Sequence, residues 1–140
     1  MEISEKNYKL IYFIAMIGVG LWVAYIKGWI LADFKSITSK EALELIKSKN
    51  YQILDVRSKE EWQKGHIKGA LSIPLEKLEN NLNRLNKNKE ILVYSKSGLK
   101  SIKASRLLVK EGFKPINVKS GILGLAISGQ ESPNLFEKGR

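Results

Sequence analysis

The chain begins with one long stretch of apolar residues. Residues 10–26 hold no charged side chain, and apolar residues continue beyond a single lysine to Ala32. A helix needs about 20 apolar residues, with about 17 as the lower limit, to cross the hydrocarbon core of a bilayer. Tyrosines and tryptophans lie towards the two ends of the stretch, where membrane interfaces favour them. The pattern predicts an N-terminal tail over residues 1–9 and one transmembrane helix over residues 10–32.

Two alternatives to a membrane anchor are weaker for this stretch. A cleaved secretory signal has a shorter apolar core and a small-x-small cleavage site, which the bulky residues Trp29, Ile30 and Leu31 disfavour. A buried helix of the following domain is the other alternative, but that domain is complete without it. Lysines are more frequent after the stretch than before it, so the positive-inside tendency places the C-terminal domain in the cytoplasm. We therefore expect a single-pass membrane protein.

Short apolar runs then alternate with amphipathic segments over residues 33–128. The runs are apolar at consecutive positions, which is typical of strands buried on both faces of a parallel sheet. We predict strands over residues 51–56, 70–73, 90–94 and 115–118, and helices after Thr38 and Ser58 and over residues 75–85, 101–111 and 121–127. This order predicts an α/β fold with a central parallel sheet of about five strands and helices on both faces. Residues 33–36 are expected to form a linker, and residues 129–140 a mobile tail.

Local signals mark turns and helix ends. Thr38 and Glu41 have the spacing of a capping box, and Ser58 is a second N-cap candidate. We expect Gly65 and Gly69 to be turn residues with backbone angles that other residues avoid. Helical spacing predicts core positions for Leu75, Leu78, Leu82 and Leu85.

Composition excludes several classes of site. The chain has no cysteine and a single histidine, His66, which rules out disulfides, thiolate metal sites and clusters of histidine ligands. We expect no metal and no cofactor. The net charge is +10, and residues 33–140 hold 21 Lys and Arg against 12 Asp and Glu. This excess suits anionic small molecules or lipid headgroups, or a solvated lysine-rich surface. The basic residues are scattered and form no nucleic-acid motif, so no nucleic-acid partner is expected.

The segment from Val93 to Ser101 carries the candidate chemistry. Its pattern is that of a buried strand, a six-residue loop from Ser95 to Lys100, and the start of a helix. A loop in this position turns backbone N–H groups inward and can hold an anion at the helix N-terminus.

Three segments, in the same order, resemble a single-domain rhodanese over residues 37–127. They are Ile53–Arg57 (ILDVR), Glu61–Ala70 (EWxxGHIxGA) and the loop segment Val93–Ser101. The resemblance implies a rhodanese-like fold and a loop whose first residue is a cysteine that carries sulfane sulfur as a persulfide. It also implies that the loop amides and a basic residue stabilise an anion. On this chain the cysteine position is Ser95, and the anion-binding loop comprises Lys96, Ser97, Gly98, Leu99 and Lys100.

Serine lacks the chemistry that this position needs. A cysteine thiol with a pKa of about 8.5 is readily ionised at a helix N-terminus. A hydroxyl needs an adjacent base instead, and none is evident beside Ser95. Lys100 stands where the family often has an arginine, which keeps the charge but loses the bidentate fork. We therefore expect the chain to be inactive in sulfur transfer.

Asp55 and Arg57 are the supporting residues of the predicted site. They follow a strand, at the sheet edge where α/β proteins place their sites. We expect a structural ion pair that ties loops together. His66 is expected to anchor a loop through hydrogen bonds.

Three functions are compatible with this site. The first is a non-catalytic rhodanese-like domain at a membrane, which binds a small sulfur oxyanion or a protein-thiol partner. The second is a thiosulfate-type sulfurtransferase whose active cysteine has been replaced in this chain. The third is a phosphatase of the cell-cycle dual-specificity class, which shares the fold. Phosphatase loops of that class are one residue longer than the six-residue Ser95–Lys100 loop, which argues against the third function.

Overall fold

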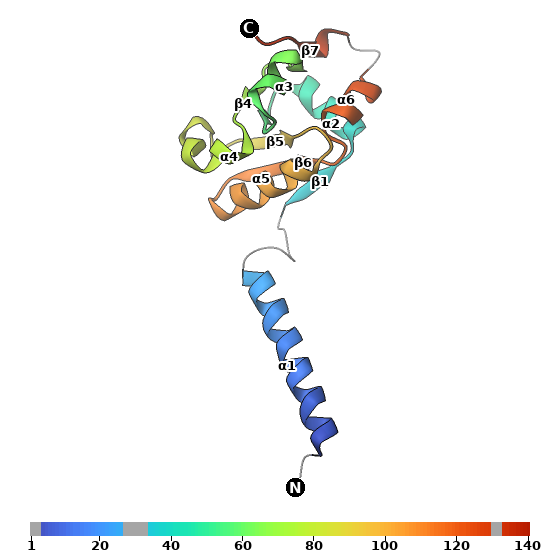
Figure 1. Ribbon diagram of the computed structural model, residues 1–140. Helices are drawn as coiled ribbons and strands as arrows, with labels where there is room; N and C mark the ends of the chain where they lie inside the picture. The colour runs from blue at the N-terminus through green and yellow to red at the C-terminus, as the bar shows by residue number, and fades with distance from the viewer. Residues whose placement is uncertain (1–3, 27–33, 130–132) are drawn as a thin grey trace. The chain divides into compact units, whose positions relative to one another are not determined.

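The computed structural model describes residues 4–26, 34–129 and 133–140, and the chain forms two compact units, residues 1–32 and 33–140. The described residues of the first unit form the helix α1 (Glu5–Ile26), which begins inside the predicted tail (Figure 1). Its segment Glu5–Tyr25 is long and apolar enough to cross a membrane, with a mean hydropathy of 1.6. Residues 27–32 of the predicted span lie outside the described residues.

The second unit is built on a five-stranded sheet in the order β1-β6-β5-β2-β4, in which every neighbouring pair is parallel (Figure 1). The predicted α/β fold with a parallel sheet is confirmed. The strands are β1 (Lys35–Ile37), β2 (Gln52–Asp55), β4 (Leu71–Ser72), β5 (Glu90–Tyr94) and β6 (Lys114–Val118). β1 begins in the segment predicted as a linker, residues 33–36, because its three residues gain their hydrogen bonds only by pairing with β6.

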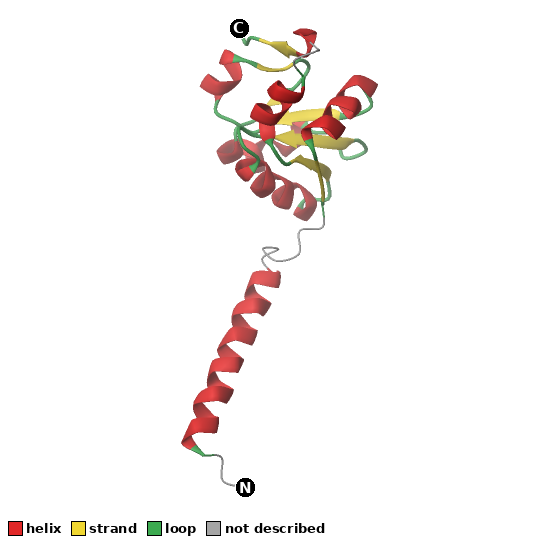
Figure 2. Ribbon diagram, turned by 90° about the vertical axis from the view of Figure 1, so that its right-hand side faces the viewer, coloured by secondary structure: helices red, strands yellow, loops and turns green. Residues whose placement is uncertain are grey.

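Helices cover both faces of this sheet (Figure 2). Alternate residues of β5 point to opposite sides, so Ile91 and Val93 join one buried cluster while Leu92 and Tyr94 join the other. The first cluster lies under α4, η1 and α5, and the second under α2 and α6. The helices are α2 (Ser39–Ser48), α3 (Lys59–Lys64), α4 (Leu75–Leu78), the 3-10 helix η1 (Glu79–Arg84), α5 (Leu99–Lys110) and α6 (Gly121–Ser128).

Two predicted helix starts are confirmed, and one predicted helix is not continuous. Capping boxes begin α2 at Thr38 and α3 at Ser58. The predicted helix over residues 75–85 becomes 3-10 after Leu78, and its backbone is non-helical at Asn81. The Asn81 side chain donates a 2.7 Å hydrogen bond to the Lys77 carbonyl, a local bond that competes with the helical one.

The core positions predicted for four leucines are confirmed, but only one of the two predicted turn glycines has a special backbone angle. Leu78 and Leu85 are buried, and Leu75 and Leu82 pack against the same cluster, as the spacing predicted. Gly69 has a positive φ of 82°, which confirms the special turn angle expected there. The expectation for Gly65 was wrong, because its φ of 163° is extended backbone that any residue adopts.

The C-terminal segment differs from the predicted mobile tail. The two-residue strand β7 (Phe136–Glu137) pairs antiparallel with β3 (His66–Ile67). The Lys68 N–H donates to the Leu135 carbonyl at 2.8 Å, and the Gly139 N–H to the Gln63 carbonyl at 3.0 Å. These partners are some 70 residues apart along the chain, so no local pattern could reveal the pairing.

Candidate functional site

The predicted loop lies at the carboxyl end of β5, in the centre of the sheet. Ser95 follows the strand directly, and α5 begins four residues later at Leu99. Ser95 and Gly98 are buried, whereas Lys96, Ser97, Leu99 and Lys100 are exposed. The parallel register thus places the first loop residue inside the protein and the remaining side chains at its surface.

The Ser95 hydroxyl sits at the centre of the loop. Its Oγ accepts hydrogen bonds from the backbone N–H groups of Gly98 (3.1 Å) and Ser101 (3.3 Å). It lies 3.4 Å from the Ser101 Oγ, which itself donates to the Gly98 carbonyl at 2.9 Å. Within residues 34–129, no carboxylate, imidazole or ammonium group hydrogen-bonds this hydroxyl. The arrangement therefore offers no general base to Ser95.

The backbone at the start of α6 holds the loop in place. The carbonyls of Ser95 and Lys96 accept hydrogen bonds from the N–H groups of Ile122 (2.8 Å) and Leu123 (3.4 Å). A Cβ on Gly121 would lie 2.4 Å from the Ser95 carbonyl oxygen, so only glycine allows this approach. The sequence indicates the start of this helix but not its contact with the loop.

The loop has backbone N–H groups that no described residue engages. No hydrogen bond within the described residues engages the backbone N–H groups of Ser97, Leu99 and Lys100. The latter two belong to the first turn of α5, where the helix dipole favours an anion. The Lys100 ammonium points to Glu76 on α4, at 3.9 Å between Nζ and Oε1. Both side chains are half exposed or more, so this surface pair holds the cation only weakly.

The supporting residues Asp55 and Arg57 form a buried ion pair. The Arg57 Nη2 lies 2.7 Å from the Asp55 Oδ2 and 2.7 Å from the Gly65 carbonyl oxygen. The Arg57 Nε lies 3.1 Å from both carboxylate oxygens. Burial alone would lower the pKa of Arg57, but the hydrogen bonds and charge of Asp55 outweigh it and raise that pKa. The pair ties the end of β2 to the turn before β3, and no hydrogen bond joins it to the loop residues within the described chain.

Comparison with known proteins identifies this arrangement. Residues 38–126 match the family of the rhodanese-like domain. The chain belongs to this family. The putative sulfur carrier protein YrkF of Bacillus subtilis is 44% identical over 87 residues, which cover 58% of this chain and 47% of that protein. The chain thus spans about half the length of that relative.

Two further matches agree with the family. The thiosulfate sulfurtransferase GlpE of Coxiella burnetii is 35% identical over 83 residues, which cover 59% of this chain and 78% of that protein. The crystal structure of a rhodanese-like domain protein from Staphylococcus aureus has a TM-score of 0.66 and 33% identity. That match covers 76% of this chain and all of the other.

Tyr94 completes the buried support of this rhodanese-like domain. Its hydroxyl accepts a 3.1 Å hydrogen bond from the Ile67 N–H, and its ring lies 5.7 Å from the Arg57 guanidinium. Burial, followed by the charge of Asp55, raises the pKa of the Tyr94 hydroxyl well above its ordinary value. The sequence predicted no role for Tyr94 beyond its place in a strand, because its partners Asp55, Arg57 and Ile67 are distant from it along the chain.

His66 anchors two segments of the rhodanese-like domain. Its ring stacks on Trp62, with centroids 3.9 Å apart. Its Nδ1 lies 2.9 Å from the Trp62 carbonyl oxygen, and its Nε2 lies 3.1 Å from the Glu137 carboxylate. The histidine is buried within this contact, so it acts as the loop anchor that the sequence led us to expect.

We predict that Gly98→Ala will destabilise the domain more than a turn glycine elsewhere. Gly98 has a φ of 99°, and a Cβ there would lie 2.0 Å from the Lys119 carbonyl oxygen. Strain and overlap together should lower the free energy of unfolding by about 3 kcal/mol. Gly69→Ala is the matched control, since Gly69 also has a positive φ but faces open space, and should cost about 1 kcal/mol. Equal losses in denaturant unfolding would contradict the close contact.

We predict that stability will fall as the pH rises above about 10. An unfolded tyrosine loses its proton near that pH, whereas the raised pKa keeps Tyr94 protonated in the folded state. The unfolded state then binds fewer protons, so the free energy of unfolding decreases with pH. Tyr94→Phe should flatten this decline in unfolding measured from pH 8 to 11. The prediction fails if the variant keeps the wild-type slope.

Proposed function

We propose that the chain is a membrane-anchored, non-catalytic rhodanese-like domain that binds an anion or a protein partner through the Ser95 loop. The observation that carries this proposal is the Ser95 hydroxyl, buried and held by two backbone N–H groups without a neighbouring base. The alternative is a sulfurtransferase whose cysteine has been replaced at this one position.

The chemistry of the hydroxyl supports the absence of sulfur transfer. Persulfide formation needs a thiolate that attacks a sulfur donor, and the loop of the family supplies it from cysteine. An alcohol has no comparable acidity and would need a base within hydrogen-bond distance. The groups around Ser95 are instead two amides and the Ser101 hydroxyl.

The loop N–H groups that no described residue engages support anion binding. The first turn of α5 provides N–H groups as hydrogen-bond donors. The ammonium groups of Lys96 and Lys100 add positive charge at the loop surface. The names of two relatives refer to a sulfur carrier and a thiosulfate sulfurtransferase. We therefore expect a small sulfur oxyanion, or a protein that carries sulfur on a thiol, to be the partner.

Apolar side chains beside the loop support a protein partner. Leu99 is 73% exposed, and Leu123 and Ile127, one turn apart on α6, are also exposed. The hydrogen bond from the Leu123 N–H to the Lys96 carbonyl brings α6 against the loop. Exposed leucine and isoleucine next to a basic loop are typical of an interaction surface. The α1 helix would hold this surface at a membrane, with the domain in the cytoplasm.

We predict that Ser95→Cys will introduce thiosulfate-to-cyanide sulfur transfer, which the wild-type chain will lack. The cysteine sulfur would meet the N–H groups that now bind the Ser95 Oγ, and these groups stabilise a thiolate. Ser97→Cys is the control, because it places a thiol in the same loop but on the exposed side. The measurement is thiocyanate formation by the full chain in neutral detergent. Turnover by the wild-type chain above background would refute the non-catalytic function.

We predict that sulfate will raise the melting temperature of the full chain at constant ionic strength. An anion at ten times its dissociation constant adds about 1.4 kcal/mol to the free energy of unfolding. Lys100→Gln should reduce the rise, whereas Lys103→Gln, an exposed lysine further along α5, should not. No rise at millimolar sulfate in the wild-type chain would contradict anion binding and leave the protein partner as the function of the loop.

A further inference from the structure

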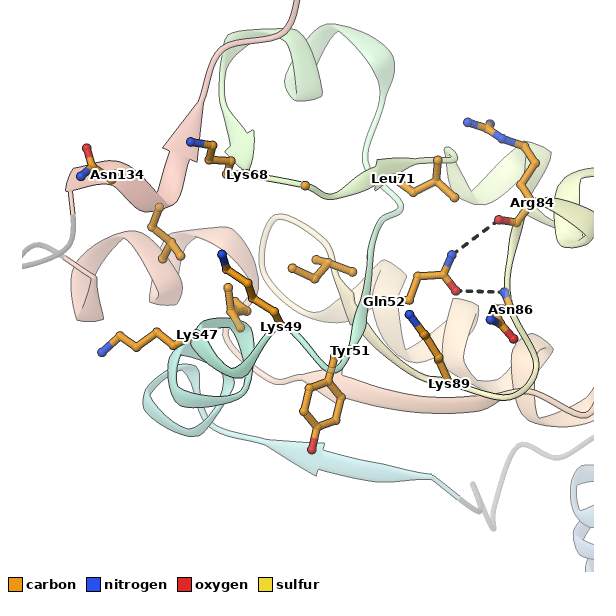
Figure 3. A pocket seen from close by; sticks show the side chains of 14 residues that line it. Lys47, Lys49, Tyr51, Gln52, Lys68, Leu71, Arg84, Asn86, Lys89 and Asn134 are labelled. Atoms are coloured by element: carbon orange, nitrogen blue, oxygen red, sulfur yellow. Dashed lines mark hydrogen bonds between the residues drawn. The ribbon is translucent and has the colours of Figure 1, made fainter.

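A second candidate site lies at the other end of the sheet. A cavity of about 850 Å³ is lined by Tyr51 and Gln52, at the start of β2, and by Leu71, at the start of β4 (Figure 3). Gln52 pairs in register with Ile91 at the amino end of β5, whereas Ser95 follows the carboxyl end of β5. The cavity therefore lies at the amino ends of the parallel strands, and the Ser95 loop lies at their carboxyl ends. Its volume is within the range of small-molecule sites.

Four basic side chains reach this cavity from four separate segments. Lys49 follows α2, Lys68 lies between β3 and β4, Arg84 ends η1, and Lys89 precedes β5. Figure 3 shows their side chains around the same hollow. Segments distant in sequence thus place four basic residues along the lining of one cavity, which gives the cavity a positive potential.

Among the described residues, the lining of the cavity carries basic side chains and no carboxylate. Five of its fourteen lining residues are Lys or Arg, and none is Asp or Glu. Lys47 is paired with Glu44 at 3.3 Å. In the described part of the chain, no salt bridge engages the other four basic residues. The cavity therefore has a positive potential that an anionic ligand would neutralise.

The backbone at Lys49 gives this cavity a further distinguishing feature. Its φ of 57° makes it the one non-glycine residue with a positive φ among the described residues. Glycine or asparagine is the usual residue at such a helix end, because other side chains are strained there. A lysine at this position keeps a cation at the mouth of the cavity despite the strain.

Apolar residues form part of the cavity lining, which we call its floor. Hydrogen bonds of Gln52 hold the segment of residues 84–86, which we call its rim. Ile53 and Leu135 line it together with Leu71. The Gln52 side chain accepts a hydrogen bond from the Asn86 N–H at 3.0 Å and donates to the Arg84 carbonyl at 3.5 Å (Figure 3). The rim that carries Arg84 and Asn86 is thus tied to the sheet. A ligand with an apolar part could rest on this floor while its charged part meets the rim.

We propose that this cavity binds a ligand in which phosphate groups are joined to an apolar or ring-shaped part. Phosphate carries multiple charge and several acceptor oxygens, which match ammonium and guanidinium groups that converge from different directions. The apolar floor matches the remainder of such a ligand. Both a soluble phosphorylated compound and the headgroup of an anionic phospholipid have this chemistry.

The test uses the full chain in bilayer discs of phosphatidylcholine, with ADP as the soluble probe. Hydrogen exchange is measured on the cavity segments, residues 49–53 and 84–90, as ADP is titrated. We expect ADP to slow exchange there, and Lys49→Gln/Lys68→Gln/Lys89→Gln to weaken its apparent affinity at least tenfold.

A matched control removes three exposed lysines elsewhere. Lys59→Gln/Lys103→Gln/Lys110→Gln makes the same change in net charge, but none of the three residues lines the cavity. It should change the ADP affinity less than twofold. If the control loses as much affinity as the cavity variant, general attraction to a basic surface explains the binding and the site is refuted.

A second arm identifies the source of the phosphate. Discs that contain phosphatidylglycerol should slow exchange of the same segments without ADP if a lipid headgroup is the ligand. Protection by ADP in phosphatidylcholine discs, without any effect of phosphatidylglycerol, assigns the site to a soluble compound. Absence of protection by either probe refutes the proposal. Sulfur transfer by Ser95→Cys does not depend on these lysines, so the result is separate from the function of the Ser95 loop.

Discussion

The loop after β5 closes around its own first side chain, and this contact determines what the site can do. The amides of Gly98 and Ser101 point at the Ser95 hydroxyl, so the donors that would stabilise a thiolate instead satisfy a neutral oxygen. A buried hydroxyl with these hydrogen-bond partners is satisfied without a general base. The N–H groups of Leu99 and Lys100, in the first turn of α5, form no hydrogen bond with the described residues. The anion binding that we propose for the loop would use these groups.

This geometry depends on close backbone contact rather than on side chains of the site. Gly98 lies against the backbone of Lys119, and Gly121 against the carbonyl of Ser95. Elsewhere in the domain, the buried pair of Asp55 and Arg57 joins β2 to the turn before β3. Breaking such a pair leaves an uncompensated buried charge, which is strongly destabilising. The pair therefore stabilises the domain, whereas the backbone contacts of Gly98 and Gly121 hold the loop itself.

The carboxyl and amino ends of the parallel strands offer different groups to a ligand. At the carboxyl edge, backbone amides and one half-exposed lysine form a small cradle. At the amino ends of the strands, basic side chains from four segments line a cavity of about 850 Å³ that also has apolar lining residues. The first arrangement suits a compact oxyanion or a group presented by a protein. The second suits a larger ligand, because its charges are spread over a wide rim.

The sequence determined the class of fold, the positions of most helices and strands, and the identity of the loop. The signals were local: apolar runs, capping boxes at Thr38 and Ser58, and three segments that resemble the family. Such signals do not depend on how the elements pack. The sequence's resemblance to the family also led us to propose that Ser95 occupies the cysteine position of the loop. It could not reveal that β1 pairs with β6, because three residues hold no pattern of their own.

Tertiary structure alone decided which distant groups meet. The fold places Lys100 near Glu76, and it pairs the C-terminal strand β7 with β3, which contains His66. It also gathered four basic residues around one cavity, although they look scattered along the chain. The physical reason is that hydrophobic periodicity and capping act over a few residues, whereas charge convergence and strand pairing depend on the path of the whole backbone.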